Sequence, residues 1–435
     1  MSCRFLHPKS QGSPAFEVAD LFEIPSTQNS ISSSSIISVG PVNTIDSLDH
    51  SQNLDYYVPS FADHMLDLNN VYIFFKLGLR YADGTVPPAS STLVPAQDFA
   101  TSYIKSLEIF LNDVQIDNTP LHYALSNHIG YLFNTSNSAK TGILSASHYN
   151  LDYDEFKDRF KKSVSKNFDT YTRLSCPLFN QEKLLVSNVD LKIRLTRTSP
   201  KFHLNTQSDT EIAKAPFCSI LETYLVIRKS KLTPNTYLAV ENRLQADTAK
   251  YVMQSVVQRQ HILPSSILSY SINQLQQGSL PSKLLIFFQS NKSSNGDYKA
   301  DCFKFHHYNI SSCSLYVNGI LIGKPYVTTF SSDEKEIPLV ARAFHDLQLL
   351  LDDASPEGNG ISMMQYNDNT AIFGFDLSSS YTDCQSVLNP VETGDISIKL
   401  TFNAALPEAV TCNILMVFPA ILEIDGSRQI ILKQL

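Results

Sequence analysis

Two stretches of the sequence, "IKSLEIFLNDVQID" at residues 104–117 and "ISSCSLYVNGILIG" at residues 310–323, align with each other without a gap. In both, apolar side chains alternate, a polar pair follows, and the alternation resumes. Alternation places every second side chain on one face of a β-strand. The polar pairs, Asn-Asp in the first stretch and Asn-Gly in the second, suit a two-residue turn whose central residues both need positive φ. We therefore predict the same β-hairpin twice in one chain.

Further matches occur in the same order in both halves of the chain. Apolar strands precede both hairpins, helical patterns with a 3.6-residue period follow them, and alternating strands come later. The matching segments are 72–77 and 285–290, 121–133 and 340–351, 190–196 and 395–401, and the strands that open at Cys218 and Cys412. Such an ordered series indicates a tandem duplication of one domain of about 200 residues.

The composition limits the possible functions. Hydrophobic residues make up 43% of the 435 residues and charged residues 17%, below the roughly 25% charged residues of an average domain. The net charge of −8 argues against a dedicated nucleic-acid-binding protein. No apolar run is long enough for a membrane span. Seven cysteines at irregular spacings suit a reducing compartment with free, buried thiols.

The pattern favours an all-β fold of two tandem antiparallel jelly-roll β-sandwiches, a double jelly roll, with short helices in the connecting loops. The reasons are the many short strands, the turn signals, the few helices and the lack of a strand–helix alternation. We predict a flexible N-terminal arm at residues 1–16, a first jelly roll at 17–232 and a second at 233–435. Two fused copies make a pseudo-twofold block, and three such chains around an axis give a near-hexagonal prism that can tile a shell.

No set of residues in the sequence predicts catalysis. His306 and His307 are adjacent in an alternating stretch, so we expect them to point to opposite faces of a strand and not to share a metal ion. The spacing of Cys302 and Cys313 fits no zinc pattern. The sequence has neither the His-x-His pair of cupin enzymes nor a Gly-x-Ser-x-Gly nucleophile elbow. We predict no catalytic, cofactor-binding or metal-binding residues.

Several polar or glycine-bearing segments are interpreted as structural or surface features. The basic stretch 157–166 is expected to be a solvent-exposed loop, with contact to a polyanion as the alternative. Residues 355–362 lack the lysine of a P-loop and are expected to form a mobile loop. The acidic residues of 331–336 suit a solvated face or a contact between subunits better than a calcium site. Cys218 and Cys412 are expected to be buried packing residues.

Five segments together carry a likeness to a known family. They are "LFEIPSTQNSI" at 21–31, "LDLNNVYIFFKLGLRYADGT" at 66–85, "SLEIFLNDVQI" at 106–116, and residues 290–319 and 405–430. In this order they resemble the major capsid protein of Polinton/Maverick elements and adintoviruses, a double jelly-roll lineage that includes the adenovirus hexon. The segment "PSTQNS", where the family more often has Pro-Pro-Thr-Gln-Thr, and the serine run that follows depart from the family pattern.

The resemblance implies a structural protein of the virion and not an enzyme. It implies a hexon-like homotrimer that forms a pseudo-hexameric capsomer of an icosahedral shell around double-stranded DNA. Its partners would be neighbouring capsomers, a single jelly-roll penton protein and minor capsid proteins, with DNA contacted only non-specifically. Assembly would take place inside the host cell, in the nucleus. The alternative is a lectin-like tandem β-sandwich that binds carbohydrate, for which "YNDNTAIF" at 366–373 offers an aromatic ring and amide groups.

Overall fold

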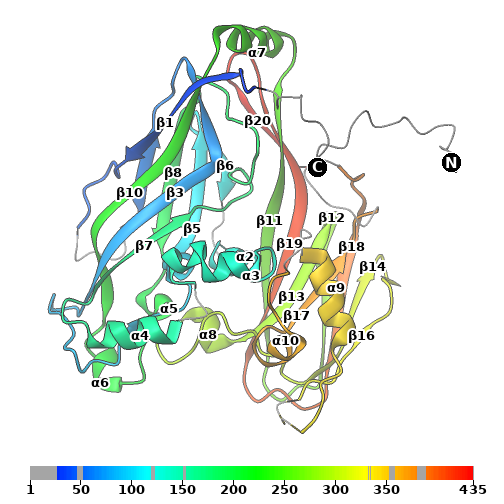
Figure 1. Cartoon of the computed structure of the whole chain (residues 1–435). Coiled ribbons are helices and arrows are strands. Elements are labelled where there is room, and N and C mark those ends of the chain that lie inside the picture. Colours follow the sequence, from blue (N-terminus) through cyan, green and yellow to red (C-terminus); the bar gives the residue numbers. More distant parts are fainter. Residues whose placement is uncertain are drawn as a thin grey trace, which may run out of the picture.

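The computed structural model describes most of the chain as β-strands (Figure 1). The described residues are 27–46, 52–118, 123–149, 153–331, 333, 335–351, 358–379 and 388–434. The arm predicted at residues 1–16 lies outside them. Two sandwiches stand side by side, and the strands of both run mainly along the long direction of the molecule (Figure 1).

The first sandwich is built from two four-stranded sheets. The strand orders are β1-β10-β3-β7 and β2-β8-β5-β6, and all pairs are antiparallel. The bounds are β1 Ile31–Val39, β2 Leu54–Val58, β3 His64–Arg80, β5 Ile104–Leu111, β6 Val114–Asn118, β7 Asn167–Arg173, β8 Leu191–Arg197 and β10 Phe217–Leu232, with the short pair β4 Val94–Pro95 and β9 Leu204–Asn205 outside the two sheets.

The second sandwich has the strand orders β11-β19-β13-β17 and β12-β18-β14-β15. Two further strands join it, since β20 pairs with β19 and β16 pairs with β14. The bounds are β11 Ala249–Leu263, β12 Ser269–Ser279, β13 Lys283–Ser290, β14 Ile310–Val317, β15 Ile320–Leu321, β16 Tyr326–Val327, β17 Ile372–Asp376, β18 Thr393–Phe402, β19 Val410–Ile424 and β20 Ile430–Gln434.

Each strand of the first sandwich has a counterpart in the second. Replacing β1, β10, β3 and β7 by β11, β19, β13 and β17 reproduces the first sheet, and replacing β2, β8, β5 and β6 by β12, β18, β14 and β15 reproduces the second. Two facing four-stranded sheets in this order form a jelly roll. The predicted fold class, a double jelly roll, is therefore confirmed.

Both predicted hairpins are present. The turn between β5 and β6 has φ of 45° at Asn112 and 64° at Asp113, and the turn between β14 and β15 has 52° at Asn318 and 76° at Gly319. Positive φ at both central residues defines the type I′ turn. The neighbouring pairing also repeats, since β5 pairs with β8 in the way that β14 pairs with β18.

One predicted correspondence is wrong in register. Cys218 lies opposite Leu79 of β3, whereas Cys412 lies opposite Phe288 of β13. If residues 72–77 match 285–290, Phe288 corresponds to Phe75, four positions before Leu79. The two cysteines belong to equivalent strands but not to equivalent positions. Both are nevertheless buried, as predicted.

Most helices lie in the lower half of the view, with α2, α3 and α9 near mid-height, and α7 lies at the upper end (Figure 1). The predicted helices are confirmed as α2 and α9. The bounds are α1 Phe99–Tyr103, α2 Tyr123–Phe133, α3 Asn137–Thr141, η2 Ile143–Ser147, α4 Tyr153–Lys162, α5 Pro200–His203, α6 Asp209–Ile212, α7 Pro234–Ala246, α8 Asn291–Asn295, α9 Ala341–Leu351 and α10 Met363–Asn369. In α7, Pro234 occupies the first turn, where its missing N–H costs nothing.

The basic stretch 157–166 was predicted to be a loop, and this prediction is wrong. Most of the stretch belongs to the helix α4. Lys157 and Arg159 pair with acidic residues one turn earlier in the helix, each at 2.5 Å. Lys166 is fully buried at the start of β7, and its Nζ donates to the backbone carbonyls of Phe160 and Lys161. The sequence pattern missed this because a lysine can be buried when its ammonium closes a helix C-terminus.

Candidate assembly surfaces

The residues considered for chemistry do not come together as a site. Among the residues that the structure describes, no group of three or more His, Cys, Asp or Glu side chains could hold a metal ion. His306 and His307 lie outside any strand, which corrects the prediction, because β14 begins only at Ile310. The His307 ring stacks on Phe330 with centroids 4.8 Å apart.

The described cysteines have no thiol poised for reaction. Cys176, Cys218, Cys302, Cys313 and Cys412 are buried and form no disulfide. Burial raises the thiol pKa of Cys218, Cys302, Cys313 and Cys412. A protonated thiol is a weak nucleophile and a poor metal ligand.

Buried side chains anchor two segments that the sequence analysis considered for function. Of the predicted loop 355–362, residues 355–357 lie outside the described residues, and in the rest Asn359 is buried and its amide donates to the carbonyl of Phe133 at 3.1 Å. In 366–373, Tyr366 is fully buried and its hydroxyl donates to the carbonyl of Ile372. This aromatic ring cannot stack on a sugar, and the lectin alternative loses its sequence support.

The structure instead places many polar and apolar side chains at the contact between the two sandwiches. At one end, Arg428 follows β19 and donates to the carbonyl of Ser187 in the first sandwich at 2.9 Å. It also pairs with Glu241 of α7 at 2.6 Å, and its side chain is only 10% exposed. Asn112, at the tip of the first hairpin, donates to the carbonyl of Arg428 at 3.0 Å. The tip of one copy is thus fastened to the other copy.

The edge strand β11 lies against the segment that precedes β8. The hydroxyl of Tyr251 donates to the carbonyl of Leu184 at 3.0 Å and accepts from the N–H of Val186 at 3.1 Å. Burial raises the pKa of Tyr251 to about 12. Tyr251 and Met253 belong to the hydrophobic core of the first sandwich, although they lie on a strand of the second.

The helix α2 makes the middle of the contact. Ile129 and Phe133 of this helix belong to the core of the second sandwich. The ring of His128 stacks on Phe303, with centroids 4.0 Å apart and planes 7° apart. Its Nδ1 lies 2.8 Å from a carboxylate oxygen of the fully buried Asp98. Each copy therefore contributes side chains to the core of the other.

A backbone hydrogen bond and an ion pair join the two sandwiches at the end of the molecule opposite α7. The N–H of Thr206 donates to the carbonyl of Tyr298 at 2.9 Å, and Lys299 pairs with Asp209 at 2.7 Å. With the contacts of Arg428, β11 and α2, the two sandwiches are joined along their whole length. This fixes their relative orientation, so the doubled unit is one rigid block.

A buried cation lies in this contact. Lys140 of α3 is 5% exposed, and its Nζ donates to the carbonyls of Leu132 in the first sandwich and Asn359 in the second. Burial lowers the pKa of Lys140 to about 8. Two carbonyl acceptors stabilise the ammonium, but they do not replace the water that it loses.

We expect Lys140 to make stability rise with pH between about 8 and 10.4. In this window the unfolded chain still binds the proton that the folded protein has lost, so each rise of one pH unit favours folding by up to about 1.4 kcal/mol. The measurement is urea unfolding of the parent and of Lys140→Met at pH 7, 8, 9 and 10. The stability difference, parent minus variant, should increase along this series. A constant difference would contradict the buried ammonium.

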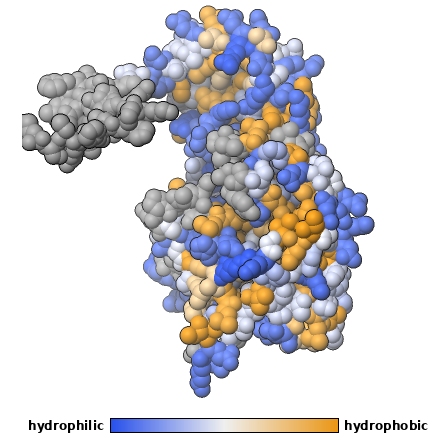
Figure 2. All heavy atoms as spheres, turned by 90° about the vertical axis from the view of Figure 1, so that its right-hand side faces the viewer, coloured by the Kyte–Doolittle hydropathy of each residue, from blue (hydrophilic) through white to orange (hydrophobic). Residues whose placement is uncertain are grey.

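Two surfaces of the doubled unit expose apolar side chains. On the outer face of the β1-β10-β3-β7 sheet, Tyr72 stacks on Tyr171 at 5.2 Å and Phe74 stacks on Tyr224 at 4.8 Å. Along the β14 edge of the second sandwich the exposed aliphatic side chains are Ile320, Leu321, Val327, Ile337 and Leu339. Apolar patches are visible on the side of the molecule that carries this sandwich (Figure 2). Exposed patches of this kind mark contacts with other proteins.

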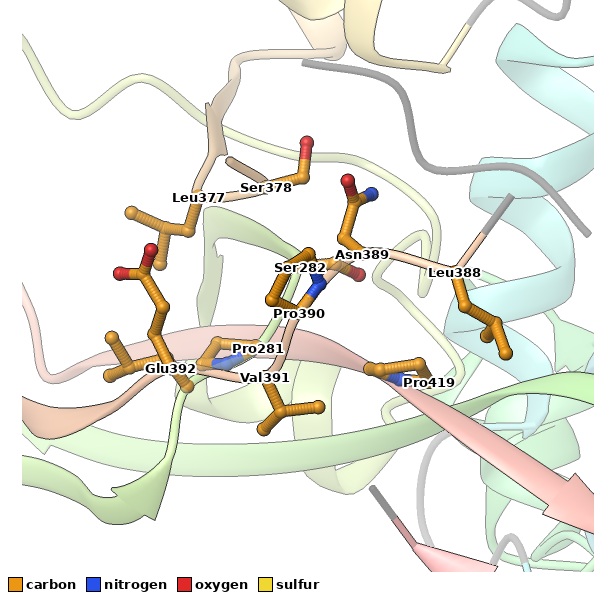
Figure 3. Close-up of a pocket in the computed structure, with 11 residues that line it drawn as sticks. Pro281, Ser282, Leu377, Ser378, Leu388, Asn389, Pro390, Val391, Glu392 and Pro419 are labelled. Atoms are coloured by element: carbon orange, nitrogen blue, oxygen red, sulfur yellow. The ribbon is translucent and has the colours of Figure 1, made fainter. Parts of the chain in front are cut away.

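A pocket opens beside the start of β13, at the end of the second sandwich away from most helices (Figure 3). It is a shallow hollow with a cavity volume of about 30 Å³ and is partly open to solvent. The lining residues are Leu280, Pro281, Ser282, Leu377, Ser378, Leu388, Asn389, Pro390, Val391, Glu392 and Pro419. The lining is mostly aliphatic and proline-rich, with a few hydroxyl and amide groups, and it lacks the cluster of titratable groups that catalysis requires.

The whole chain is similar to solved structures of viral origin. A chain of the Sputnik virophage cryo-EM structure is 11% identical with a TM-score of 0.65, covering 100% of this chain and 95% of its own length. A chain of the PBCV-1 virus capsid is also 11% identical, with a TM-score of 0.60 and coverages of 94% and 98%. The mavirus major capsid protein is 9% identical, with a TM-score of 0.51 and coverages of 100% and 97%. At these identities the likeness shows the double jelly-roll fold.

At the level of sequence, an uncharacterized Caenorhabditis elegans protein, F54H12.2, is 21% identical over 386 residues, or 83% of this chain and 89% of that protein. No protein-family model matches the chain. Among the described residues, no helix has both the length and the apolar composition needed to cross a bilayer.

Proposed function

We propose that the chain is the major capsid protein of a virus or virus-like element and has no enzymatic activity. The observation that carries the proposal is the rigid tandem of two jelly rolls, joined along their length by contacts that hold one relative orientation. A rigid block of two equivalent units is suited to tiling, because each unit can present the same kind of edge to a neighbour. End-to-end similarity to chains from a virophage and a virus capsid supports the proposal.

The finer statements belong to the same proposal. The chain would form a homotrimeric, pseudo-hexameric capsomer of an icosahedral virion shell around double-stranded DNA, in the Polinton/Maverick and adintovirus lineage that its sequence segments resemble. Its partners would be other capsomers, a single jelly-roll penton protein and minor capsid proteins, and it would assemble in the host nucleus. We also propose residues 17–232 and 233–435 as the two jelly-roll domains.

The test is the mass of the purified, full-length protein and its appearance in the electron microscope. We expect about 146 kDa by light scattering, three times the 48.6 kDa of one chain. Negative-stain images should show six-lobed particles, or shells at high protein concentration. A stable monomer at micromolar concentration, with no larger particles, would overturn the proposal, because obligate interfaces of this kind bury more than about 1,600 Å².

A further inference from the structure

The contact between β11 and the first sandwich joins two unlike surfaces. One is an edge strand, whose carbonyls at Lys250 and Val252 accept hydrogen bonds from the side chains of Lys183 and Gln181. The other is the segment that precedes β8. The two sandwiches have the same topology. Therefore the second sandwich has its own segment before β18, and the first sandwich has its own edge strand, β1.

The segment before β18 makes the same kind of backbone hydrogen bond as the segment before β8. In the first sandwich the N–H of Leu66, in β3, donates to the carbonyl of Leu185 at 3.2 Å. In the second, the N–H of Leu280, just before β13, donates to the carbonyl of Glu392 at 2.8 Å. In the first sandwich this region is covered by Tyr251 of β11. In the second it borders the open pocket, where Leu388 and Val391 are 44% and 38% exposed (Figure 3).

The edge strand β1, the counterpart of β11, is not covered by another described strand on its outer edge. Every residue from Ile31 to Val39 is exposed or half-buried, and Ile36 is 70% exposed. In β11, by contrast, Tyr251 and Met253 are 2% and 3% exposed. Among the described strands β1 pairs only with β10, so its other edge presents unpaired backbone groups. A bare edge strand is prone to pair with another chain unless something covers it.

We propose that the pocket bounded by residues 280–282 and 388–392 binds β1 of a second copy of this chain. The inference rests on the proposed function and names the surfaces that would join the subunits. Within one chain, the segment before β8 receives the edge strand of the next sandwich. Repeating this step between chains joins the pocket of one chain to β1 of the next. Such head-to-tail contacts between unlike surfaces give a closed ring when the rotation from one chain to the next is a third of a turn, as the proposed trimer requires.

The chemistry of the two surfaces is compatible. The strand is rich in serine and offers hydroxyl and backbone groups, with Ile31 and Ile36 as apolar side chains. The pocket offers Leu388, Pro390 and Val391 as apolar contacts, and Ser378 and Asn389 as hydrogen-bonding groups. Apart from the exposed Glu392 at the rim of the pocket, both sides are uncharged. The contact should therefore depend little on salt.

Cross-linking of the full-length, assembled protein tests the proposal. Ser33 of β1 lies within one residue of the position equivalent to Tyr251 of β11. Ser33 lies opposite Lys231 and Tyr251 opposite Leu422, which are one and two residues before the last residues of their partner strands, Leu232 and Ile424. We expect the double variant Ser33→Cys/Val391→Cys, treated with a short bismaleimide, to give covalent dimers and trimers on a denaturing gel. Three links close the ring, so the ladder should end at the trimer.

The controls separate this proposal from the proposed function. The matched control pair is Ser33→Cys/Val327→Cys, because Val327 is a 78% exposed valine of the second sandwich on a different edge. The parent and the single variants report the background of the native cysteines. A trimeric mass with no ladder, or with the same ladder in the control pair, would overturn this inference and leave the proposed function standing. A monomeric mass would overturn both.

A second measurement does not depend on new thiols. Ile36→Asp should shift the trimer toward monomer at least tenfold in the concentration of half-dissociation, whereas Val327→Asp should not. Both residues are exposed, so neither change should prevent folding. Equal dissociation of the two variants, or none in Ile36→Asp, would count against β1 as the docking strand.

Discussion

Replacing Gly319 with proline is expected to lower the free energy of unfolding by about 3 kcal/mol or more. Gly319 is the second central residue of the turn between β14 and β15 and has φ of +76°. The proline ring fixes φ near −65°, so the turn cannot keep its type I′ geometry. A Cβ at this position would meet no atom within 4 Å. The cost therefore arises from the backbone and not from crowding.

The measurement is thermal or urea unfolding, with Gly319→Asn as the matched control. Asparagine tolerates positive φ, and the first hairpin has Asn112 and Asp113 at its two turn positions. We expect the control to lose less than about 1 kcal/mol. For a domain of this size the proline variant should melt roughly 6–12 °C lower than the parent. A proline variant that melts within about 1 °C of the parent would show that the turn contributes nothing to folding.

The parts of the fold that the sequence predicted are those set by local pattern. Strand alternation, the turn pairs and the helical periodicity each depend on a few neighbouring residues. The repeat added long-range information, because a hairpin found at 104–117 and again at 310–323 implies that their partners recur as well. The pairing of β5 with β8 and of β14 with β18 shows that this inference was sound.

The predictions that failed depended on context beyond the local pattern. The alternation through His306 and His307 is typical of a strand, but Tyr308 and Asn309 have φ of 44° and 52°, which interrupts extended backbone just before Ile310. Lys166 belongs to a basic run, yet its ammonium finds two carbonyls at the end of α4. In each case the conformation of the neighbouring backbone outweighed the average preference of the residue type.

The contact between the sandwiches was not predictable residue by residue. Tyr251 and Met253 alternate as any strand does, and nothing nearby indicates that they complete the core of the other sandwich. Lys140 and Asn359 meet across 219 positions of sequence. The only available signal was the duplication itself, which implies two equivalent units but not how they pack. Assembly surfaces have no chemical motif, so they became visible only when equivalent surfaces of the two copies could be compared.

We expect Tyr251→Ala to lower the free energy of unfolding by about 3–5 kcal/mol, as large buried side chains do when truncated. Tyr251 is 2% exposed and lies in the core of the first sandwich although it belongs to the second. Its loss opens a cavity between the sandwiches and leaves the N–H of Val186 and the carbonyl of Leu184 without the hydroxyl that they share. Calorimetry of the full-length protein should show the main transition at a lower temperature.

Two control variants show whether the effect belongs to the contact. Tyr251→Phe keeps the ring and should lower the free energy of unfolding by about 1–2 kcal/mol, because two backbone groups lose their hydrogen-bond partner. Leu238→Ala on α7 removes a 58% exposed side chain and should stay within about 0.5 kcal/mol of the parent. If Tyr251→Ala were no more costly than Leu238→Ala, the sandwiches would not share a core. The chain would then be two loosely linked domains. The contact of β11 with the segment before β8 could no longer serve as the model for the proposed contact between chains.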